Sequence, residues 1–182
     1  MSFFTAFDSS KTTRIHATSG TSHTCCLSSE ARIPHGLLYV AQVFNVLKRV
    51  EHWPIWDVDL REVKFDTPAG TPLNETKGTL FMKNYGGGQH PFSIHNVDET
   101  SHFEYHTRLP GADAEWYWTW KQVDSGSVDM KMGVRVHGGS ALLWRAALAP
   151  FLGTAIDTCL RNLKSLSEEG KVDGKDFSNL FT

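Results

Sequence analysis

The chain has 182 residues, 40% of them hydrophobic and 21% charged, which suits one globular domain with a sizeable core. The formal net charge is -2 and no segment clusters Lys and Arg, so nucleic acid is not an expected partner. No apolar run approaches the ~20 residues needed to cross a bilayer, so no membrane span is expected.

The N-terminal stretch, residues 1–20, is rich in Ser and Thr and predicts a loosely attached arm. No apolar segment with a basic start and a small-residue cleavage site is visible in the first thirty residues, so a secretory signal is not expected. Cys25 and Cys26 are adjacent and Cys159 lies on an apolar helix stripe, so the cysteines form no disulfide framework. A cytoplasmic location fits these features.

The domain itself is expected to cover residues 21–170, and its first half mixes one strand with helical segments. A first strand is predicted within residues 21–33, ended by Pro34 and Gly36. Residues 37–50 follow as a helix, whose apolar face holds Leu37, Val40, Phe44 and Leu47. The sequence HWPIWD at 52–57 reads as a short turn-like segment.

The central part of the chain predicts an antiparallel meander. Short extended runs follow one another with turn residues between them, which is the pattern of consecutive hairpins. The predicted strands cover residues 58–66, 76–85, 91–97, 102–109, 115–123 and 127–137.

Charges allow a strand register to be written down. A three-residue loop at Asp124 to Gly126 places Lys121 opposite Asp129 and Glu115 opposite Arg135. Pairing Leu109 with Ala114 across a four-residue turn also sets Glu115 beside Arg108. The other phase then faces inward, and it holds Phe92, Ile94, Asn96, Phe103, Tyr105, Thr107, Trp116, Trp118, Trp120, Met130, Met132, Val134 and Val136.

The longest helical signal covers residues 140–170. Its apolar stripe recurs at three- and four-residue steps, through Leu148, Leu152, Ile156, Cys159, Leu163 and Leu166. Pro150 and Gly153 interrupt the pattern. Residues 171–182 form a polar tail whose late aromatic residues, Phe177 and Phe181, are candidates for docking on the domain.

These elements resemble the START-like superfamily, also called SRPBCC, helix-grip or polyketide cyclase/dehydrase-like proteins. The resemblance covers roughly residues 24–169 and is most specific in RIPHGLLYVAQVFNVLKRVEHWPIWDVDLREVKF, from Arg32 to Phe65, and in the closing helix after Gly138 and Gly139. It implies an α+β fold, in which a curved antiparallel sheet wraps around the long C-terminal helix, with one or two short helices after the first strand. Members carry lipids, sterols or hormones, or cyclise and dehydrate polyketides.

A fold of this kind holds a cavity where helix and sheet do not touch. A kink at Pro150 and the missing side chain at Gly153 favour an opening there, opposite the tryptophan residues. The alternative is that Pro150 begins the main helix after a short preceding turn.

The inward phase supplies the candidate catalytic residues. Tyr105 and Asn96 could donate hydrogen bonds to a substrate carbonyl, and Asp57 could act as a base. The plainer alternatives are a core tyrosine bonded to backbone and an aspartate that fixes the turn. The expected substrate-binding residues are Trp116, Trp118, Trp120, Thr107, Met130, Met132, Phe92, Ile94, Phe151 and Leu152, although core packing explains large residues equally well.

Metal, nucleotide and covalent chemistry find no support in the sequence. His102 and His106 lie about 13 Å apart along one strand, too far for one ion, and they fall on the outward phase with His95 and Glu104. Gly86 to Gly88 open no helix, and no nucleophile elbow is present. We therefore expect neither a cofactor nor a metal.

The function indicated is that of a cofactor-independent cyclase of secondary metabolism, acting on a hydrophobic polyketide or terpenoid intermediate. Ring closure could be aldol-type with dehydration, or pericyclic as in a Diels-Alderase if no base is present. The alternative is a non-catalytic carrier that binds a lipid or another hydrophobic small molecule. An assembly role for the N-terminal arm is a third possibility. The oligomeric state cannot be read from the sequence.

Overall fold

The computed structural model describes residues 7–15, 36–83, 88–124 and 127–181. Within these residues, seven strands form one antiparallel sheet in the order β1-β7-β6-β5-β4-β3-β2. The strands are β1 (Phe7–Ile15), β2 (Leu60–Phe65), β3 (Lys77–Met82), β4 (Gln89–Asp98), β5 (His102–Leu109), β6 (Ala112–Asp124) and β7 (Ser127–His137).

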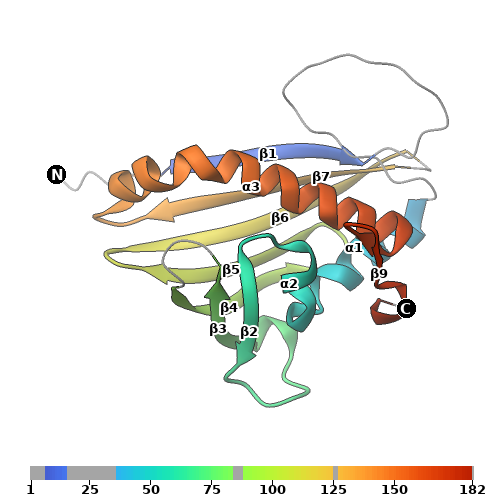
Figure 1. Cartoon of the computed structure of the whole chain (residues 1–182), viewed down its shortest axis with the longest axis horizontal. Coiled ribbons are helices and arrows are strands. Elements are labelled where there is room, and N and C mark those ends of the chain that lie inside the picture. Colours follow the sequence, from blue (N-terminus) through green and yellow to red (C-terminus); the bar gives the residue numbers. More distant parts are fainter. Residues whose placement is uncertain (1–6, 16–35, 84–87, 125–126, 182) are drawn as a thin grey trace.

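Helices connect and cover this sheet (Figure 1). The chain enters α1 (Gly36–Leu47) and η1 (Val50–His52), then α2 (Trp53–Trp56), and a further turn, η2 (Leu73–Glu75), precedes β3. The closing helix α3 (Ala141–Glu169) follows β7, and a small hairpin, β8 (Lys171–Val172) and β9 (Lys175–Asp176), leads to η4 (Ser178–Leu180). No helix among the described residues is long and apolar enough to cross a membrane.

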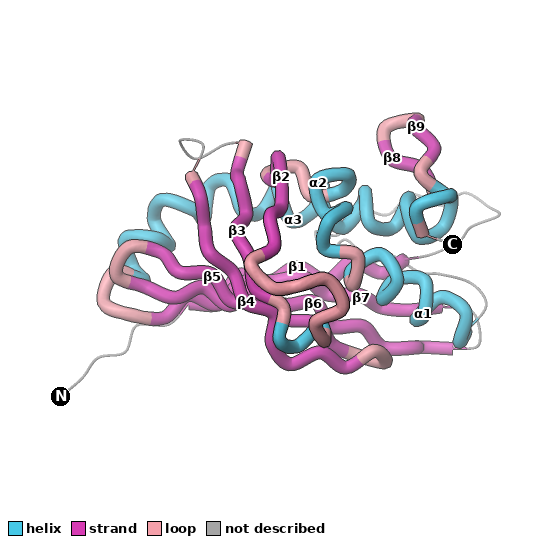
Figure 2. Tube along the Cα trace, turned by 90° about the horizontal axis from the view of Figure 1, so that it is seen from below, coloured by secondary structure: helices cyan, strands magenta, loops and turns pink. Residues whose placement is uncertain are grey.

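The sheet curls around α3, and the core fills the space between them. Figure 2 shows the sheet turning from the long strands β6 and β7 up to the short strands β2 and β3. The helix packs mainly against β1, β7 and α1. The expected stripe of α3 is buried at Leu152, Ile156, Cys159, Leu163 and Leu166, so the amphipathic pattern and the helix-grip architecture are confirmed.

The bounds of α3 follow from its terminal residues. Ser140 precedes the first turn without capping it, since its hydroxyl donates to the Pro110 carbonyl at 2.7 Å. Gly170 ends the helix in the left-handed conformation with φ of 67°. Pro150 lies inside the helix and does not begin it, so the alternative of a separate preceding turn is wrong.

The first strand differs from the sequence-based prediction. β1 falls within residues 1–20, which were expected to form an arm, and it pairs with β7 at one edge of the sheet. The predicted strand at 21–33 lies outside the described residues. The sequence of β1, FDSSKTTRI, is mostly polar and shows no apolar alternation that would predict a strand. The strand is instead stabilised by its backbone pairing with β7.

The predicted charge pairing between β6 and β7 is confirmed. Lys121 lies opposite Asp129 and Glu115 opposite Arg135, and the Glu115 carboxylate is 3.7 Å from the Arg135 guanidinium. Trp118 is fully buried, as the inward phase requires.

The hairpin between β5 and β6 is tighter than predicted. Leu109 pairs with Ala112 across a two-residue Pro110–Gly111 turn, so Glu115 lies opposite His106 and not Arg108. Gly111 has φ of 72°, which a Pro-Gly turn supplies without strain. Arg108 pairs instead with Asp113 at 3.9 Å.

The C-terminal tail docks on the domain, as its late aromatic residues suggested. Phe177 and Phe181 pack against the core. The Phe181 ring meets His52 edge-on at 5.6 Å, and the Arg49 guanidinium donates to the Leu180 carbonyl. The tail therefore covers the end of the domain where α1 meets η1.

Candidate functional site

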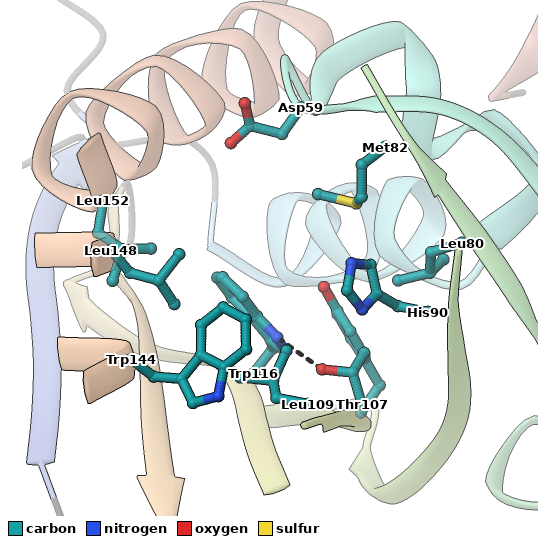
Figure 3. A pocket seen from close by; sticks show the side chains of 11 residues that line it. Asp59, Leu80, Met82, His90, Thr107, Leu109, Trp116, Trp144, Leu148 and Leu152 are labelled. Carbon is teal, nitrogen blue, oxygen red and sulfur yellow. Dashed lines mark hydrogen bonds between the residues drawn. The ribbon is translucent and has the colours of Figure 1, made fainter. Parts of the chain in front are cut away.

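A cavity of about 140 Å³ opens between the first half of α3 and the inner face of the sheet. Figure 3 shows Trp144, Leu148 and Leu152 of α3 along one side and Leu80, Met82 and His90 of β3 and β4 on the other. The lining is mostly apolar, with four polar side chains, and consists of Asp59, Leu80, Met82, His90, Tyr105, Thr107, Leu109, Trp116, Trp144, Leu148 and Leu152.

Regular secondary structure aims these side chains at the cavity. Trp144, Leu148 and Leu152 are spaced four residues apart and therefore share one face of α3. On the strands the lining residues alternate, as Tyr105, Thr107 and Leu109 do along β5. The site is therefore built on rigid elements.

The Tyr105 hydroxyl is available to hydrogen-bond a ligand in the cavity. The residue is 4% exposed, and its hydroxyl has no hydrogen-bond partner among the described residues. Burial, and then the nearby Asp57 carboxyl, raise the pKa of Tyr105 well above its usual range, so it stays a proton donor. Trp116 and Thr107 beside it are bonded to each other, Nε1 to Oγ1, at 3.2 Å.

Asp59 and His90 add a carboxylate and an imidazole to the cavity wall. Asp59 lies in the turn between α2 and β2, and its backbone N–H donates to the Asp57 carboxylate at 3.0 Å. The His90 ring has no hydrogen-bond partner in the part of the chain that the structure describes. An imidazole placed in this way can give or take a proton in the cavity.

Asp57 lies behind the cavity wall. Its carboxylate accepts from the Cys159 thiol at 3.7 Å and from the Asp59 N–H. Burial raises the pKa of Asp57 to about 6, and the neighbouring Asp59 charge adds to this effect. The residue fixes the turn after α2, as the plainer interpretation of the sequence held, and it does not line the cavity.

A family model described as polyketide cyclase/dehydrase and lipid transport matches residues 38–168. The chain belongs to this family. The match contains the whole candidate site, from Asp59 to Leu152. No curated protein matches the sequence.

Solved structures of the same fold include several enzymes of natural-product synthesis. The ZhuI aromatase/cyclase from Streptomyces sp. R1128 is 9% identical with a TM-score of 0.61, and the similarity covers 95% of this chain and 99% of that one. Norcoclaurine synthase from Thalictrum flavum, in complex with dopamine and hydroxybenzaldehyde, is 9% identical with a TM-score of 0.59, over 93% and 90% of the two chains.

The di-domain aromatase/cyclase StfQ of the steffimycin biosynthetic pathway is 12% identical with a TM-score of 0.58. The similarity covers 91% of this chain but 51% of StfQ, so this chain spans about half the length of that protein. At these identities the likeness establishes the fold.

Four of the residues selected from the sequence for catalysis or substrate binding line the cavity. They are Tyr105, Thr107, Trp116 and Leu152. Most of the others are buried in the core and do not reach the cavity, namely Trp118, Trp120, Met130, Met132, Phe92 and Ile94. Trp118, for example, packs against Trp53 and Trp56 at ring distances of 6.2 and 6.0 Å.

Asn96 does not point inward. A bulge between His95 and Asp98 breaks the alternation of β4, and Asn96 takes φ of 48° and is exposed. Asparagine tolerates this left-handed conformation better than most residues. The expected second donor is therefore absent from the site.

Phe151 also faces away from the cavity. It is 56% exposed, because the residues of α3 that face the sheet are Leu148 and Leu152, and Phe151 lies on the outer side. Pro150 and Gly153 do not line the cavity either; Pro150 is exposed and lies in the sequence between the lining residues Leu148 and Leu152.

Among the cavity residues that the sequence-based prediction missed are Trp144, His90 and Asp59, and the first two lie where the periodicity of their elements continues. The stripe of α3 extends back by four residues from Leu148 to Trp144. His90 precedes Phe92 by two positions and so continues the inward phase of β4. Asp59 lies in a turn, where no periodicity applies.

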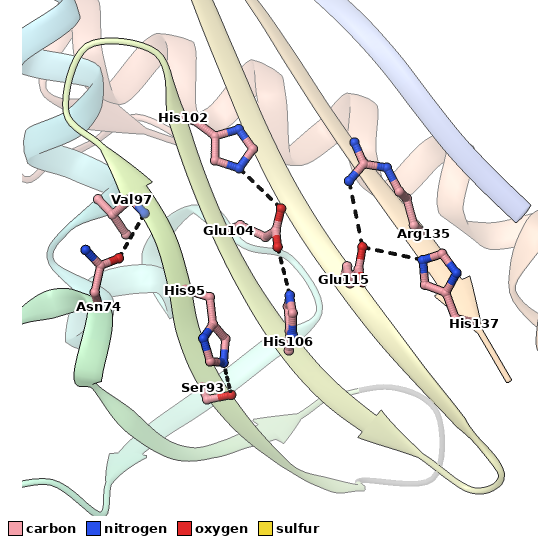
Figure 4. Close-up of polar contacts among 10 residues, drawn as sticks. All are labelled: Asn74, Ser93, His95, Val97, His102, Glu104, His106, Glu115, Arg135 and His137. Atoms are coloured by element: carbon pink, nitrogen blue, oxygen red, sulfur yellow. Dashed lines mark hydrogen bonds and ion pairs between the residues drawn. The ribbon is translucent and has the colours of Figure 1, made fainter. Parts of the chain in front are cut away.

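Four further histidines, His95, His102, His106 and His137, lie on the outer face of the sheet (Figure 4). The Glu104 carboxylate accepts from His106 at 2.8 Å and from His102 at 3.2 Å. The His95 ring contacts that of His106 in a tilted arrangement, with ring centroids 4.6 Å apart. His102 and His106 are bridged by a carboxylate on the outward phase, as the alternation predicted. Among the described residues, no group of three or more His, Cys, Asp or Glu is arranged to hold a metal ion.

Proposed function

We propose that this protein is a cyclase of natural-product biosynthesis that closes a ring in a small hydrophobic polyketide or terpenoid intermediate by aldol chemistry with loss of water. The observation that carries the proposal is the unpartnered Tyr105 hydroxyl in an apolar cavity that also receives His90. Membership in a family of polyketide cyclases and lipid transporters supports it.

The side chains divide the chemistry between them. Tyr105 donates to a substrate carbonyl and stabilises the negative charge that develops on its oxygen. His90 takes the proton from the carbon next to that carbonyl, and the resulting enolate carbon forms a bond to a second carbonyl carbon. The protonated His90 returns its proton to the alkoxide that forms on the second carbonyl, which becomes a hydroxyl group. His90 then takes the second proton from the same nucleophilic carbon, a carbon–carbon double bond forms as the carbon–oxygen bond breaks, and the protonated His90 gives this proton to the hydroxyl, which leaves as water.

The apolar walls support the positioning part of the reaction. The indoles of Trp116 and Trp144 and the leucines of α3 hold a flexible chain folded, so that its reacting carbons meet. The steps are proton transfers, formation of a carbon–carbon bond and loss of water by cleavage of a carbon–oxygen bond, with no net oxidation or reduction, so the proposal includes no cofactor. The presence of a candidate base favours aldol closure over a pericyclic, Diels-Alder-type reaction.

A non-catalytic carrier is the second candidate function, because the cavity lining is predominantly apolar. A carrier needs the same cavity but no acid or base. Its ligand would be a lipid or another hydrophobic metabolite held without reaction.

Metabolite profiling of a strain lacking the gene separates the two functions. For a cyclase, the strain accumulates an uncyclised precursor, and the wild-type protein converts that precursor in vitro, while Tyr105→Phe binds it and converts it about 100-fold more slowly. If the precursor pool is unchanged and the purified protein binds a metabolite without changing it, the carrier function holds.

A further inference from the structure

A second cavity lies at the opposite end of α3 from the candidate active site. It encloses about 190 Å³ between α1, the last turn of α3 and the C-terminal segment. Figure 1 shows α1, the end of α3 and the C-terminus together at one end of the molecule. Leu148 and Ser167 are separated by about 28 Å along the helix, so the two cavities are distinct.

Three buried oxygen atoms without a hydrogen-bond partner belong to residues that line this cavity. They are Oε1 of Gln42, Oγ of Ser167 and Oε1 of Glu168, and the remaining unpartnered buried side-chain atoms of the described residues are indole nitrogens elsewhere. Ser167 is only 8% exposed. Buried oxygens in native proteins are nearly always hydrogen-bonded, so this grouping calls for an occupant that donates hydrogen bonds.

The electrostatic setting favours a positively charged donor. The cavity lies at the C-terminal end of a 29-residue helix, where the helix dipole is negative. Glu168 contributes a carboxylate whose side chain is 18% exposed, and Glu169 lies next to it. Lys164 forms an ion pair with Glu168, with 3.8 Å between Nζ and Oε1; this distance is beyond that of a hydrogen bond, so the oxygen can still accept one from a second donor.

The walls select among cations. A divalent metal needs six or more oxygens and usually several carboxylates, which this cavity does not bring together. An ammonium group has three N–H donors, one for each unpartnered oxygen. Val46, Leu166 and the Phe181 ring supply apolar surface for an attached hydrocarbon chain.

We propose that this cavity binds a small primary amine, whose ammonium group is held by Gln42, Ser167 and Glu168 and whose hydrocarbon part lies against Val46 and Phe181. The site is independent of the proposed cyclase reaction, and its occupant ties α1 to the end of α3.

We expect the affinity for the amine to increase as the Glu168 carboxyl loses its proton. Burial raises the pKa of Glu168 to about 7, while Lys164 opposes this effect and Glu169 adds to it. The Glu168 carboxyl shares the cavity with side chains from two other elements, namely Gln42 of α1 and Ser178 and Phe181 of the C-terminal segment. On that side, the Arg49 guanidinium lies over the Phe181 ring. Because the carboxylate form binds the ammonium, affinity rises between pH 6 and pH 8.

The test is calorimetric titration of the full chain with butylammonium chloride. The wild-type protein is expected to bind it, and Glu168→Gln should weaken binding at least about tenfold, because the amide oxygen can still accept a hydrogen bond but no longer carries the negative charge that attracts the ammonium. Ser167→Ala should weaken binding about fivefold, and it replaces Glu168→Gln if that variant does not fold.

Control variants and salts test whether the amine binds in this cavity. Glu99→Gln removes an exposed carboxylate from a distant turn, and Asp59→Asn removes the carboxylate of the first cavity; both should bind as the wild type does. Loss of binding in Asp59→Asn would place the amine in the first cavity and overturn the proposal. Equal binding by Glu168→Gln, equal binding of KCl or tetramethylammonium chloride by the wild type, or no binding of butylammonium at all would overturn it as well.

Discussion

The Cys159 thiol donates to the Asp57 carboxylate across 3.7 Å and so joins the middle of α3 to the turn after α2. Asp57 is buried and does not line the cavity, but its negative charge helps to raise the pKa of Tyr105. Burial raises the pKa of the Cys159 thiol, so this contact keeps its proton on sulfur. The pair therefore sets both the helix position and the electrostatics behind the candidate catalytic tyrosine.

Asp57 makes the stability of the protein depend on pH. Its pKa rises from an ordinary value of 3.8 to about 6 on folding, because burial disfavours the charged form. The folded state therefore binds more protons than the unfolded state between pH 4 and pH 6, and stability falls as pH rises through that window. We expect Asp57 to cost about 2 kcal/mol at pH 7 relative to pH 4.

Denaturant unfolding of the wild type and Asp57→Asn at pH 4, 5, 6 and 7 measures this effect. As pH rises, the wild type should lose unfolding free energy relative to Asp57→Asn. Asp98→Asn is the matched control, because the pKa of the exposed Asp98 is lowered by its bonds to Thr100 and the difference should shift the other way. A pH-independent difference for Asp57→Asn would contradict the prediction.

Tyr105→Phe separates binding from turnover. The substitution keeps the ring and removes only the hydroxyl, which has no partner among the described residues, so the fold should be unaffected. If the hydroxyl stabilises a developing oxyanion, kcat falls about 100-fold while substrate affinity changes little. Steady-state kinetics on the precursor identified by profiling provides the measurement, with Tyr117→Phe as a control on the outward phase of β6. Unchanged kcat in Tyr105→Phe would remove Tyr105 from the mechanism.

Much of the fold could be predicted because two kinds of pattern agree along β6 and β7. Apolar alternation assigned Trp118 to the core, and the opposite charges of Glu115 and Arg135 fixed the same register. The closing helix could be placed almost to the residue, because its stripe is regular and Gly170 marks its end. Both patterns can be recognised within a short stretch of sequence, and the folded protein keeps the pairing and burial that they predict.

The candidate site was predicted less well, because it depends on departures from regularity. The bulge that turns Asn96 outward leaves no clear trace in the alternation of β4. Asp59 reaches the cavity from a turn whose path is set by the Asp57 side chain. Whether an inward residue lines a cavity or fills the core depends on how closely α3 approaches it, which the sequence of one strand does not contain.

The tryptophans of β6 should separate into core and site residues. Trp118→Ala removes a fully buried ring that packs against Trp53, Trp56 and Phe103, and it should destabilise the protein by about 3–5 kcal/mol. Trp116 is half-buried at the cavity, so Trp116→Ala should cost less than half as much and instead weaken binding of phenol about tenfold. Thermal unfolding and fluorescence titration check the two effects. Similar stability losses in both variants would show that Trp116 is also a core residue.

Filling the cavity from α3 should block ligand binding without unfolding the protein. A cavity of about 140 Å³ is close in size to engineered cavities of ~150 Å³ that take up benzene, so phenol is a suitable probe. Leu148→Trp places an indole in that space from a half-buried position, and we expect at least about tenfold weaker phenol binding with an equal or higher Tm. Leu143→Trp makes the same change at a site on α3 that is 74% exposed, and it should bind phenol as the wild type does. Normal binding by Leu148→Trp would mean that phenol binds elsewhere on the protein, because the added indole occupies the space that the ligand needs.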